Sequence, residues 1–481
     1  MGYKHGTYGD ITNSKVASIA QSATVAAYVG TAAINLIRGY KNADLINTPI
    51  KLTNMNEAVS KLGKASDWNS FTLCEAFAQH FEVQNSGPIF VVNVLNPEIH
   101  KKGEKTSVSL NVANKRAEFE SSTIILDSFA IEDKVEGVDY ELTYNFDKGT
   151  VVVKFLTAVS GSVSVSYDEV DPAAVEESDI IGTAANGEYS GIRALELLYQ
   201  KYNAVLDILA SPGWSERPTV YAAMCGAVTK LNGHWDGFVN ADIPVSESVD
   251  TIEKAIAWKN ENGYTDERSK ACWPMAVDGS GRKFHLSTIV TAKMLSVDSA
   301  NGDIPFETVS NKSVTAAKQY FGENSKNKGF DQSNANTLNE AGITTICFWA
   351  GRWVIWGAHT AAYTFGGSMD ARAIFDVNIR MLMYITNMFQ LDHGTQVDQP
   401  MTLQLKETIL AAERERLDML VGIGALVGEP VCEFSDSENP ESDIVNGDFV
   451  WHFSVTNTPP FKSGTARVTY TDDGFQAYYA E

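Results

Sequence analysis

The sequence predicts a multidomain α/β protein with an inserted all-β module and an α+β C-terminal domain. Strand-like and helical segments alternate on both sides of residues 100–170, whereas those residues show short β runs and almost no helical periodicity. Two amphipathic helices followed by strands occupy the last third of the chain. Because 481 residues are too many for one hydrophobic core, we expect two to four domains.

The first α/β part covers residues 21–99. A run of small and β-branched residues that ends near a glycine is typical of a buried strand, and Asn56 is a suitable cap for the helix that follows it. The order strand, helix, helix, strand opens an α/β domain. We expect strands over 24–32 and 88–94 and helices over 56–62 and 71–81.

Residues 100–170 form the predicted β module. Asp147-Lys148-Gly149 joins two of its runs as a tight hairpin, and the acidic stretch 168–179 closes the module as a linker. We expect strands near 108–110, 123–126, 140–146, 151–155 and 163–167.

The α/β alternation then resumes over residues 171–365. Alternation of this kind implies a mainly parallel sheet that is covered on both faces. We expect helices over 191–202, 219–231 and 249–260, and strands over 205–210, 237–243, 270–277 and, in two runs, 343–356.

Both ends of the chain are predicted to be extended arms. Residues 1–20 are polar and rich in glycine, with only weak alternation. At the other end, Arg467–Tyr470 and Phe475–Tyr479 alternate as strands across the turn 472–474. A terminal strand has a free edge, which is either an aggregation hazard or a connector. Aromatic residues among the last positions favour the connector.

Composition and charge exclude several function classes. The net charge of -22 argues against a nucleic-acid binder, which needs a basic surface. The five cysteines are scattered without CxxC pairs, which excludes a disulfide framework and a zinc knuckle and favours free thiols in a reducing compartment. The N-terminus has no signal-peptide core, and the apolar stretch 341–365 is interrupted by Arg352 and His359. We therefore expect no membrane binding and synthesis in the cytoplasm.

No motif in the chain predicts catalysis. There is no GxSxG nucleophile elbow and no GxxxxGK phosphate loop, and the glycines of 422–428 have the wrong spacing for a dinucleotide loop. The eight histidines do not cluster. We predict no catalytic, metal-binding or cofactor-binding residues and no cofactor, although an α/β chain could still bring Asp, His and Ser together.

Segments along the whole chain, in order, carry a family resemblance. They are 25–32, 47–54, 61–63, 205–214, 352–357, 360–361, 370–388, 405–420, 439–444 and 447–460. In this order and spacing the sequence resembles the contractile tail sheath proteins of phages and phage-derived bacteriocins. The residues do not separate those two origins.

The resemblance implies a structural protein. It implies a subtilisin-like middle domain without a working triad, and subunits that form six-fold rings stacked helically around a tail tube. The implied partners are further copies of the chain, the tube protein, and baseplate and tail terminator proteins, in a virion tail or a phage-tail-like particle. Contraction from a metastable extended state would drive the tube through the target envelope without nucleotide.

The resemblance also implies domain boundaries and contact residues. The domains are 1–20 (N-terminal arm), 21–99 and 171–365 (α/β domain), 100–170 (β module), 366–465 (C-terminal sheath domain) and 466–481 (C-terminal arm). Both arms would add strands to a neighbour's C-terminal sheet. The contacts expected are Tyr3, Tyr8, Ile11 and Val16 in the N-terminal arm, Val468, Tyr470, Phe475, Tyr478 and Tyr479 in the C-terminal arm, and Lys406, Arg414 and Arg416 at the tube. The alternative function is a subtilisin-like hydrolase.

Overall fold

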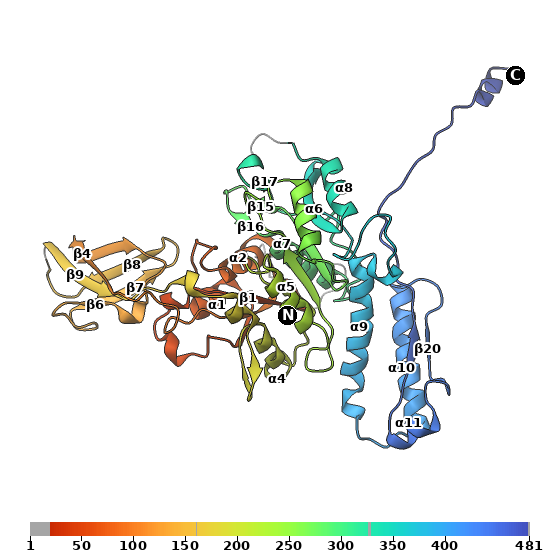
Figure 1. Cartoon of the computed structure of the whole chain (residues 1–481), viewed down its shortest axis with the longest axis horizontal. Helices are drawn as coiled ribbons and strands as arrows, with labels where there is room; N and C mark the ends of the chain where they lie inside the picture. The colour runs from red at the N-terminus through yellow and green to blue at the C-terminus, as the bar shows by residue number, and fades with distance from the viewer. Residues whose placement is uncertain (1–19, 160, 326–328, 480–481) are drawn as a thin grey trace, which may run out of the picture.

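The computed structural model describes residues 20–159, 161–325 and 329–479. The predicted N-terminal arm contacts Tyr3, Tyr8, Ile11 and Val16 lie outside the described residues. The molecule is elongated (Figure 1). A strand-rich lobe lies at one end, an α/β body in the middle and a pair of long helices at the other end, from which the C-terminal segment runs outward.

An eight-stranded sheet forms the centre of the body, in the order β19-β18-β14-β13-β12-β1-β3-β2. The inner strands run parallel, and β2 and β19 are antiparallel edge strands. The parallel core confirms the sheet expected from the alternation of strands and helices. The strands are β1 Ala20–Gly30, β2 Pro49–Leu52, β3 Ser86–Asn93, β12 Ile208–Ala210, β13 Phe238–Asp242, β14 Ser269–Cys272, β18 Ile343–Trp349 and β19 Arg352–Trp356.

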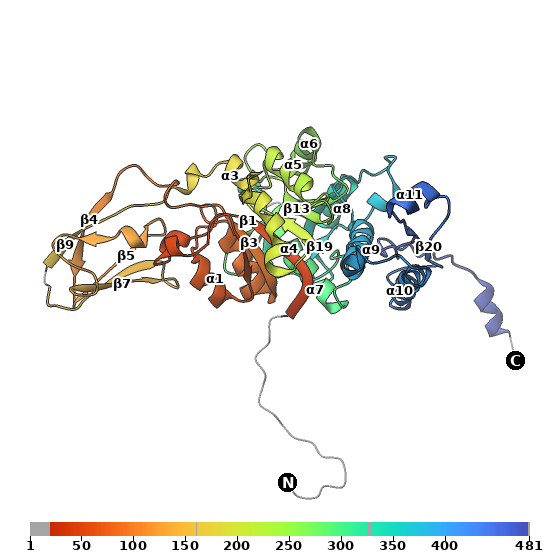
Figure 2. The same ribbon diagram turned by 90° about the horizontal axis from the view of Figure 1, so that it is seen from below.

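Helices pack on both faces of this sheet. Figure 2 shows α5 and α6 on one side of the strands and α7 on the other. The helix α7 is largely buried and packs against β1 and β13. The body helices are α1 Met55–Leu62, α2 Leu73–Ala78, α3 Glu177–Ile181, α4 Leu198–Tyr202, α5 Pro218–Ala227, α6 Ile252–Glu261, α7 Leu286–Ala300 and α8 Gln332–Glu340.

Several predicted elements are wrong in detail. The strand expected over 123–126 is only a single bridge at Ile124 followed by the 3-10 helix Leu126–Ser128. The cap of α1 is Asn54 and not Asn56, because the Asn54 side chain accepts from Glu57 N. The helix expected over 71–81 is α2 followed by a π-helical turn, Gln79–Gln84. The helix expected over 191–202 begins as the 3-10 helix Gly191–Leu197 and becomes α4 only at its end. The strand expected over 270–277 is divided, because Pro274 has no N–H to donate to a ladder. Its second half joins the small sheet of β15 Met275–Val277, β16 Lys283–Phe284 and β17 Lys318–Tyr320.

Residues 106–167 fold as two antiparallel three-stranded sheets, β4-β9-β6 and β5-β8-β7. Between them, Phe119, Phe129 and Tyr167 stack with ring centroids 5.6–6.5 Å apart. The strands are β4 Thr106–Val112, β5 Arg116–Glu120, β6 Ala130–Ile131, β7 Tyr140–Asn145, β8 Thr150–Phe155 and β9 Gly161–Tyr167, and the short hairpin β10 Ala184–Ala185 and β11 Glu188–Tyr189 follows.

The C-terminal unit, residues 376–458, contains α9 Asp376–His393, α10 Leu403–Gly422, β20 Val431–Glu433, α11 Glu441–Asn446 and β21 His452–Ser454. The helices α9 and α10 lie antiparallel (Figure 1). Met381, Ile385, Leu417 and Leu420 belong to a hydrophobic cluster of this unit. None of the described helices is long and apolar enough to span a bilayer.

The strand hairpin predicted at the C-terminus is wrong for the isolated subunit. Residues 459–471 are not assigned to a strand, and Asp473–Tyr478 form a 3-10 helix. A strand needs a partner for its backbone hydrogen bonds, and this segment leaves the body (Figures 1 and 2). The alternating side chains alone cannot supply that partner.

Candidate assembly interface

The C-terminal unit contains a sheet of only two strands. β20 and β21 pair antiparallel, with Cys432 opposite Phe453. The pairing continues towards the body, where Val427 N donates to Thr456 O (3.0 Å) and Thr458 N donates to Ala425 O (3.1 Å). A two-stranded sheet is marginal on its own, and in the described part of the chain neither outer edge pairs with a third strand. The sheet therefore offers edges that another strand can join.

The C-terminal segment 459–479, which includes the described part of the predicted arm (466–479), is exposed from Phe461 onward. The five predicted contact residues Val468, Tyr470, Phe475, Tyr478 and Tyr479 all belong to this exposed segment, and each is 54–91% exposed. Large apolar side chains that no part of their own subunit covers mark an interaction site.

An aromatic stack holds the root of this arm. The His359 ring stacks on Tyr363 and Phe375, with centroids 3.5 Å and 5.1 Å away. Burial lowers the pKa of His359 to about 4, so the ring is neutral. Because Nδ1 donates to Ile374 O (2.9 Å), Nε2 is left as an acceptor for Lys462 Nζ at 3.4 Å. This contact ties the arm to the body.

The three predicted tube contacts do not share one environment. Arg416 is 14% exposed and pairs within its own subunit with Asp392 and with the fully buried Glu413 (3.0 Å). Lys406 pairs with Glu407 (3.1 Å). Arg414 is exposed, and its Nε donates to the Cys432 carbonyl of β20 (3.0 Å). Arg416 is therefore a structural residue in the isolated subunit, whereas Arg414 lies on the surface beside the open sheet.

Three polar contacts join α9 to the body. Lys270 Nζ lies 2.9 Å from Asp376 Oδ2, and both side chains are at most 1% exposed. One turn further along α9, Arg380 pairs with the buried Asp298 of α7. Two turns beyond that, Asn387 Nδ2 donates to the Asp236 carbonyl (2.8 Å) and Asn387 Oδ1 accepts from the Asp236 amide (3.1 Å). Buried polar pairs of this kind fix one register of the helix on the body.

These junction residues were not predicted from the sequence. A signal was present, because Asp376 and Arg380 are opposite charges four residues apart on the apolar face of a predicted helix. Charges on such a face need buried partners. The partners Lys270 and Asp298 are distant in sequence, and only the fold brings them to α9.

The carboxyl edge of the sheet, where α/β enzymes bind ligands, contains a group of Asp, Ser and His side chains. Asp242 ends β13 and accepts from Ser287 N (2.9 Å) and Ser215 Oγ (3.4 Å). Both serines are fully buried. Burial raises the pKa of Asp242 to about 6.

The nearby His285 is engaged by glutamates. Its Nδ1 lies 2.7 Å from Glu75 Oε2 and its Nε2 lies 3.4 Å from Glu216 Oε1. Burial alone would lower the pKa of His285, but the two carboxylates outweigh it and raise that pKa well above its ordinary value. A histidinium with both nitrogens paired cannot serve as a general base. The described residues also hold no cluster of three or more metal-ligand side chains.

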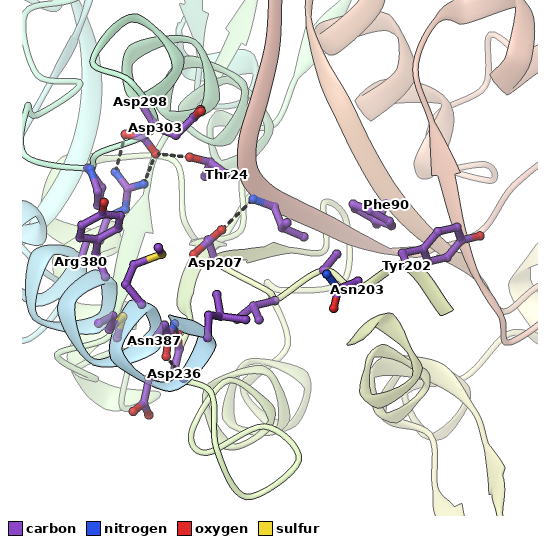
Figure 3. A pocket seen from close by; sticks show the side chains of 18 of the residues that line it. Thr24, Phe90, Tyr202, Asn203, Asp207, Asp236, Asp298, Asp303, Arg380 and Asn387 are labelled. Atoms are coloured by element: carbon purple, nitrogen blue, oxygen red, sulfur yellow. Dashed lines mark hydrogen bonds and ion pairs between the residues drawn. The ribbon is translucent and has the colours of Figure 1, made fainter. Parts of the chain in front are cut away.

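A cavity of about 500 Å³ lies at the opposite, amino edge of the sheet. Residues of β1, the segment that precedes β12, the end of α7 and the inner face of α9 line it (Figure 3). Asp207 lines it, and burial raises the pKa of this carboxyl to about 7. The cavity lies between the body and α9, away from the edge at which α/β sheets place their catalytic groups.

In the described residues, a two-stranded sheet with open edges and an exposed aromatic segment define a surface that further chains can join. No protein-family model matches the sequence. The tail sheath protein of Burkholderia phage BcepMu is 25% identical in an alignment of 494 positions that covers 97% of this chain and 96% of that protein. The tail sheath protein of Escherichia phage P2 is 24% identical in an alignment of 312 positions that covers 63% of this chain and 74% of that protein.

Solved structures show the same fold. The helical sheath of the anti-feeding prophage in its contracted state matches with a TM-score of 0.55 and 13% identity, over 96% of this chain and 99% of that one. The sheath tail protein of Desulfitobacterium hafniense matches with a TM-score of 0.52 and 10% identity, over 89% and 93%. The resemblance to contractile tail sheath proteins is confirmed by curated relatives of that name across the chain. Those relatives are structural proteins, and no catalytic activity is indicated.

Proposed function

We propose that this chain is the repeating subunit of a contractile tail sheath. Copies assemble as stacked six-fold rings around a tail tube and contract from a metastable extended state, which drives the tube through the envelope of the target cell. The observation that carries the proposal is the two-stranded sheet β20–β21 in a chain that also has an exposed aromatic arm. One copy thus has both a strand to donate and an edge to receive one.

Strand exchange links the copies. The C-terminal arm of one subunit, and the N-terminal arm of another, add strands to the β20–β21 sheet of a third by β-augmentation. A strand that makes about five main-chain hydrogen bonds contributes on the order of 3–7 kcal/mol at about 0.5–1.5 kcal/mol each. The exposed rings of Tyr470 and Phe475 would add buried apolar area when the arm docks. The docked strand then keeps neighbouring subunits linked during contraction, while weaker contacts between their α/β bodies are exchanged.

Body and C-terminal unit move as one piece during contraction. The buried pairs Lys270–Asp376 and Arg380–Asp298 and the double hydrogen bond of Asn387 hold α9 along its length. If a buried pair separates, water cannot reach the two charges to solvate them. Sliding of α9 on the body therefore costs free energy. The motion therefore takes place at the arms, and the sheath passes from one packing of rigid subunits to another.

The tube-facing surface is proposed to be α10. Arg414 is exposed on it, and surface charges of this kind give contacts that form and release readily. Arg416 supports α10 from within the subunit and is not proposed as a contact. Lys406 stays a candidate, half-exposed beside Glu407 and with its Nζ 5.3 Å from the centre of the Phe434 ring.

Other proposed partners are the tube protein, the baseplate and the tail terminator, in a phage tail or a phage-tail-like particle. The divided α/β body is proposed to be a subtilisin-like domain without its triad, with residues 100–170 inserted as a separate module. The hydrolase alternative has no specific observation in its favour, because Asp242 and its two serines are buried and the partly exposed His285 is paired with Glu75 and Glu216.

Electron microscopy of the purified protein tests the proposal. We expect rings or tubes from the full chain, and a folded, soluble subunit that does not polymerise when residues 1–20 are deleted. A matched deletion of residues 466–481 should have the same effect. Tubes of normal length from both deletions would overturn strand exchange as the link between subunits.

A further inference from the structure

The root of the N-terminal arm is held by side chains where its ladder is irregular. β1 pairs with β3 at Ala20 and Gln21 and again from Ala26 onward, with a register shift between. Within this irregular stretch, Val25 N donates to Asp207 Oδ2 (2.7 Å), and Thr24 Oγ1 donates to Asp298 Oδ2 (3.3 Å). Asp207 N also donates to Val25 O (3.0 Å). Two carboxylates therefore fix the chain where it leaves the sheet.

One of these carboxylates also holds the C-terminal unit. Arg380 of α9 donates to both oxygens of Asp298, with Nη1 3.3 Å from Oδ1. Asp298 is fully buried and lies in the last turn of α7, where the helix dipole disfavours a negative charge. Its position there depends on Arg380. Figure 3 shows Asp298 between Thr24 on one side and Arg380 on the other.

The contacts border the cavity of about 500 Å³. Thr24, Asp207, Asp298 and Arg380 all line it. Close-packed side chains cannot shift without clashes, whereas side chains beside an open volume can. The side chains at the arm root therefore have room to shift while α9 keeps its register on the body, and Asp298 would transmit such a shift to the Arg380 side chain.

We propose that Asp298 couples the root of the N-terminal arm to the C-terminal unit through the chain of contacts Thr24–Asp298–Arg380. The coupling rests on the proposed function, in which the N-terminal arm of each subunit is attached to a neighbour. A pull on the arm displaces the shared carboxylate, and the guanidinium on α9 follows it. The subunit that donates the arm thereby passes load from its neighbour to its own strand-receiving sheet.

Hydrogen exchange on the unassembled full-length subunit tests the coupling. Thr24→Val removes the hydroxyl donor and leaves the Asp298–Arg380 pair intact. We expect exchange in residues 376–388 of α9 to rise about fivefold, the factor that corresponds to one ordinary hydrogen bond. Thr24→Ser keeps the hydroxyl and should exchange as the wild type does. Thr143→Val, an exposed threonine of β7, is the matched control and should leave α9 unchanged.

Reciprocity supplies the second arm of the test, because coupling between two sites acts equally in both directions. Arg380→Lys keeps a positive charge but loses the bidentate contact with Asp298. We expect it to raise the rate of amide hydrogen exchange at residues 24–30. A rise confined to residues 20–30 in Thr24→Val, or one spread evenly over the chain, would overturn the coupling. Since the subunit is measured before assembly, that result would leave the sheath proposal standing. Failure of the wild-type protein to polymerise would instead count against the sheath proposal.

Discussion

Lys270 and Asp376 form an ion pair that water does not reach, with Nζ 2.9 Å from Oδ2 and both side chains at most 1% exposed. The ammonium also donates to Thr344 Oγ1 (3.2 Å) and to the carbonyls of Gly357 and His359 (3.0 Å each). The ammonium of Lys270, whose hydrogen-bonding capacity is fully used, thus joins the central sheet to the first turn of α9.

Removing that cation should destabilise the subunit. Lys270→Met leaves Asp376 buried without its partner, and we expect a loss of about 3–5 kcal/mol in the free energy of unfolding. The double variant Lys270→Met with Asp376→Asn removes the stranded charge and should recover part of that loss. Urea denaturation of both variants measures it. A loss below about 1 kcal/mol for the single variant would show that the pair does not hold α9.

The carboxyl of Asp207 should make stability depend on pH. Because its pKa in the folded state is raised to about 7, the folded protein binds more protons than the unfolded chain between about pH 4 and 7. Stability therefore falls as pH rises through 7. Relative to Asp207→Asn, the wild type should lose about 1 kcal/mol between pH 6 and pH 8. Parallel unfolding curves of the two proteins at both pH values would contradict this.

The two arginines of α10 should separate stability from assembly. Arg416→Ala leaves the buried Glu413 in contact with His393 Nε2 (2.6 Å) but without its guanidinium partner, and should cost about 1–3 kcal/mol. Arg414→Ala should cost about 1 kcal/mol or less, because the side chain is exposed. Binding to the tube should be weakened more by Arg414→Ala than by Arg416→Ala. Thermal melting and co-sedimentation with tube protein compare them, and equal effects on melting would refute the division of roles.

The arm aromatics should matter only in the assembly. Tyr470→Ser and Phe475→Ser change side chains that are 80% and 54% exposed, so the unfolding free energy of the subunit should stay within about 0.5 kcal/mol of the wild type. Polymer length should fall sharply. The exposed Phe365 (68%), outside the arm, gives the control variant Phe365→Ser. If that control shortens the polymer as much as the arm variants, the effect is not specific to the arm.

The parallel core could be predicted from short apolar stretches followed or preceded by glycine or proline, which β1, β3, β12 and β13 each contain or adjoin. Such patterns failed where tertiary contacts decide the local form. Residues 191–197 adopt a 3-10 helix despite an amphipathic pattern, and the terminal strands lack a partner in the isolated chain. The arm residues could be named from alternation and aromatic content. Asp298 and Lys270 could not, because their partners lie 82 and 106 residues further along the chain.

The most direct test of strand exchange is a cross-link between copies. The five native cysteines are buried, so a cysteine introduced at Val468 and another at Val431 on the open sheet can be oxidised selectively. We expect a ladder of disulfide-linked multimers from assembled double variant on a non-reducing gel, and monomers from either single variant. If the double variant polymerises but runs as a monomer on that gel, the C-terminal arm does not dock on the β20 side of the neighbouring sheet. In a second double variant, the sheet cysteine is placed at Ser454 of β21. If that variant also polymerises and runs as a monomer, the result contradicts strand exchange itself.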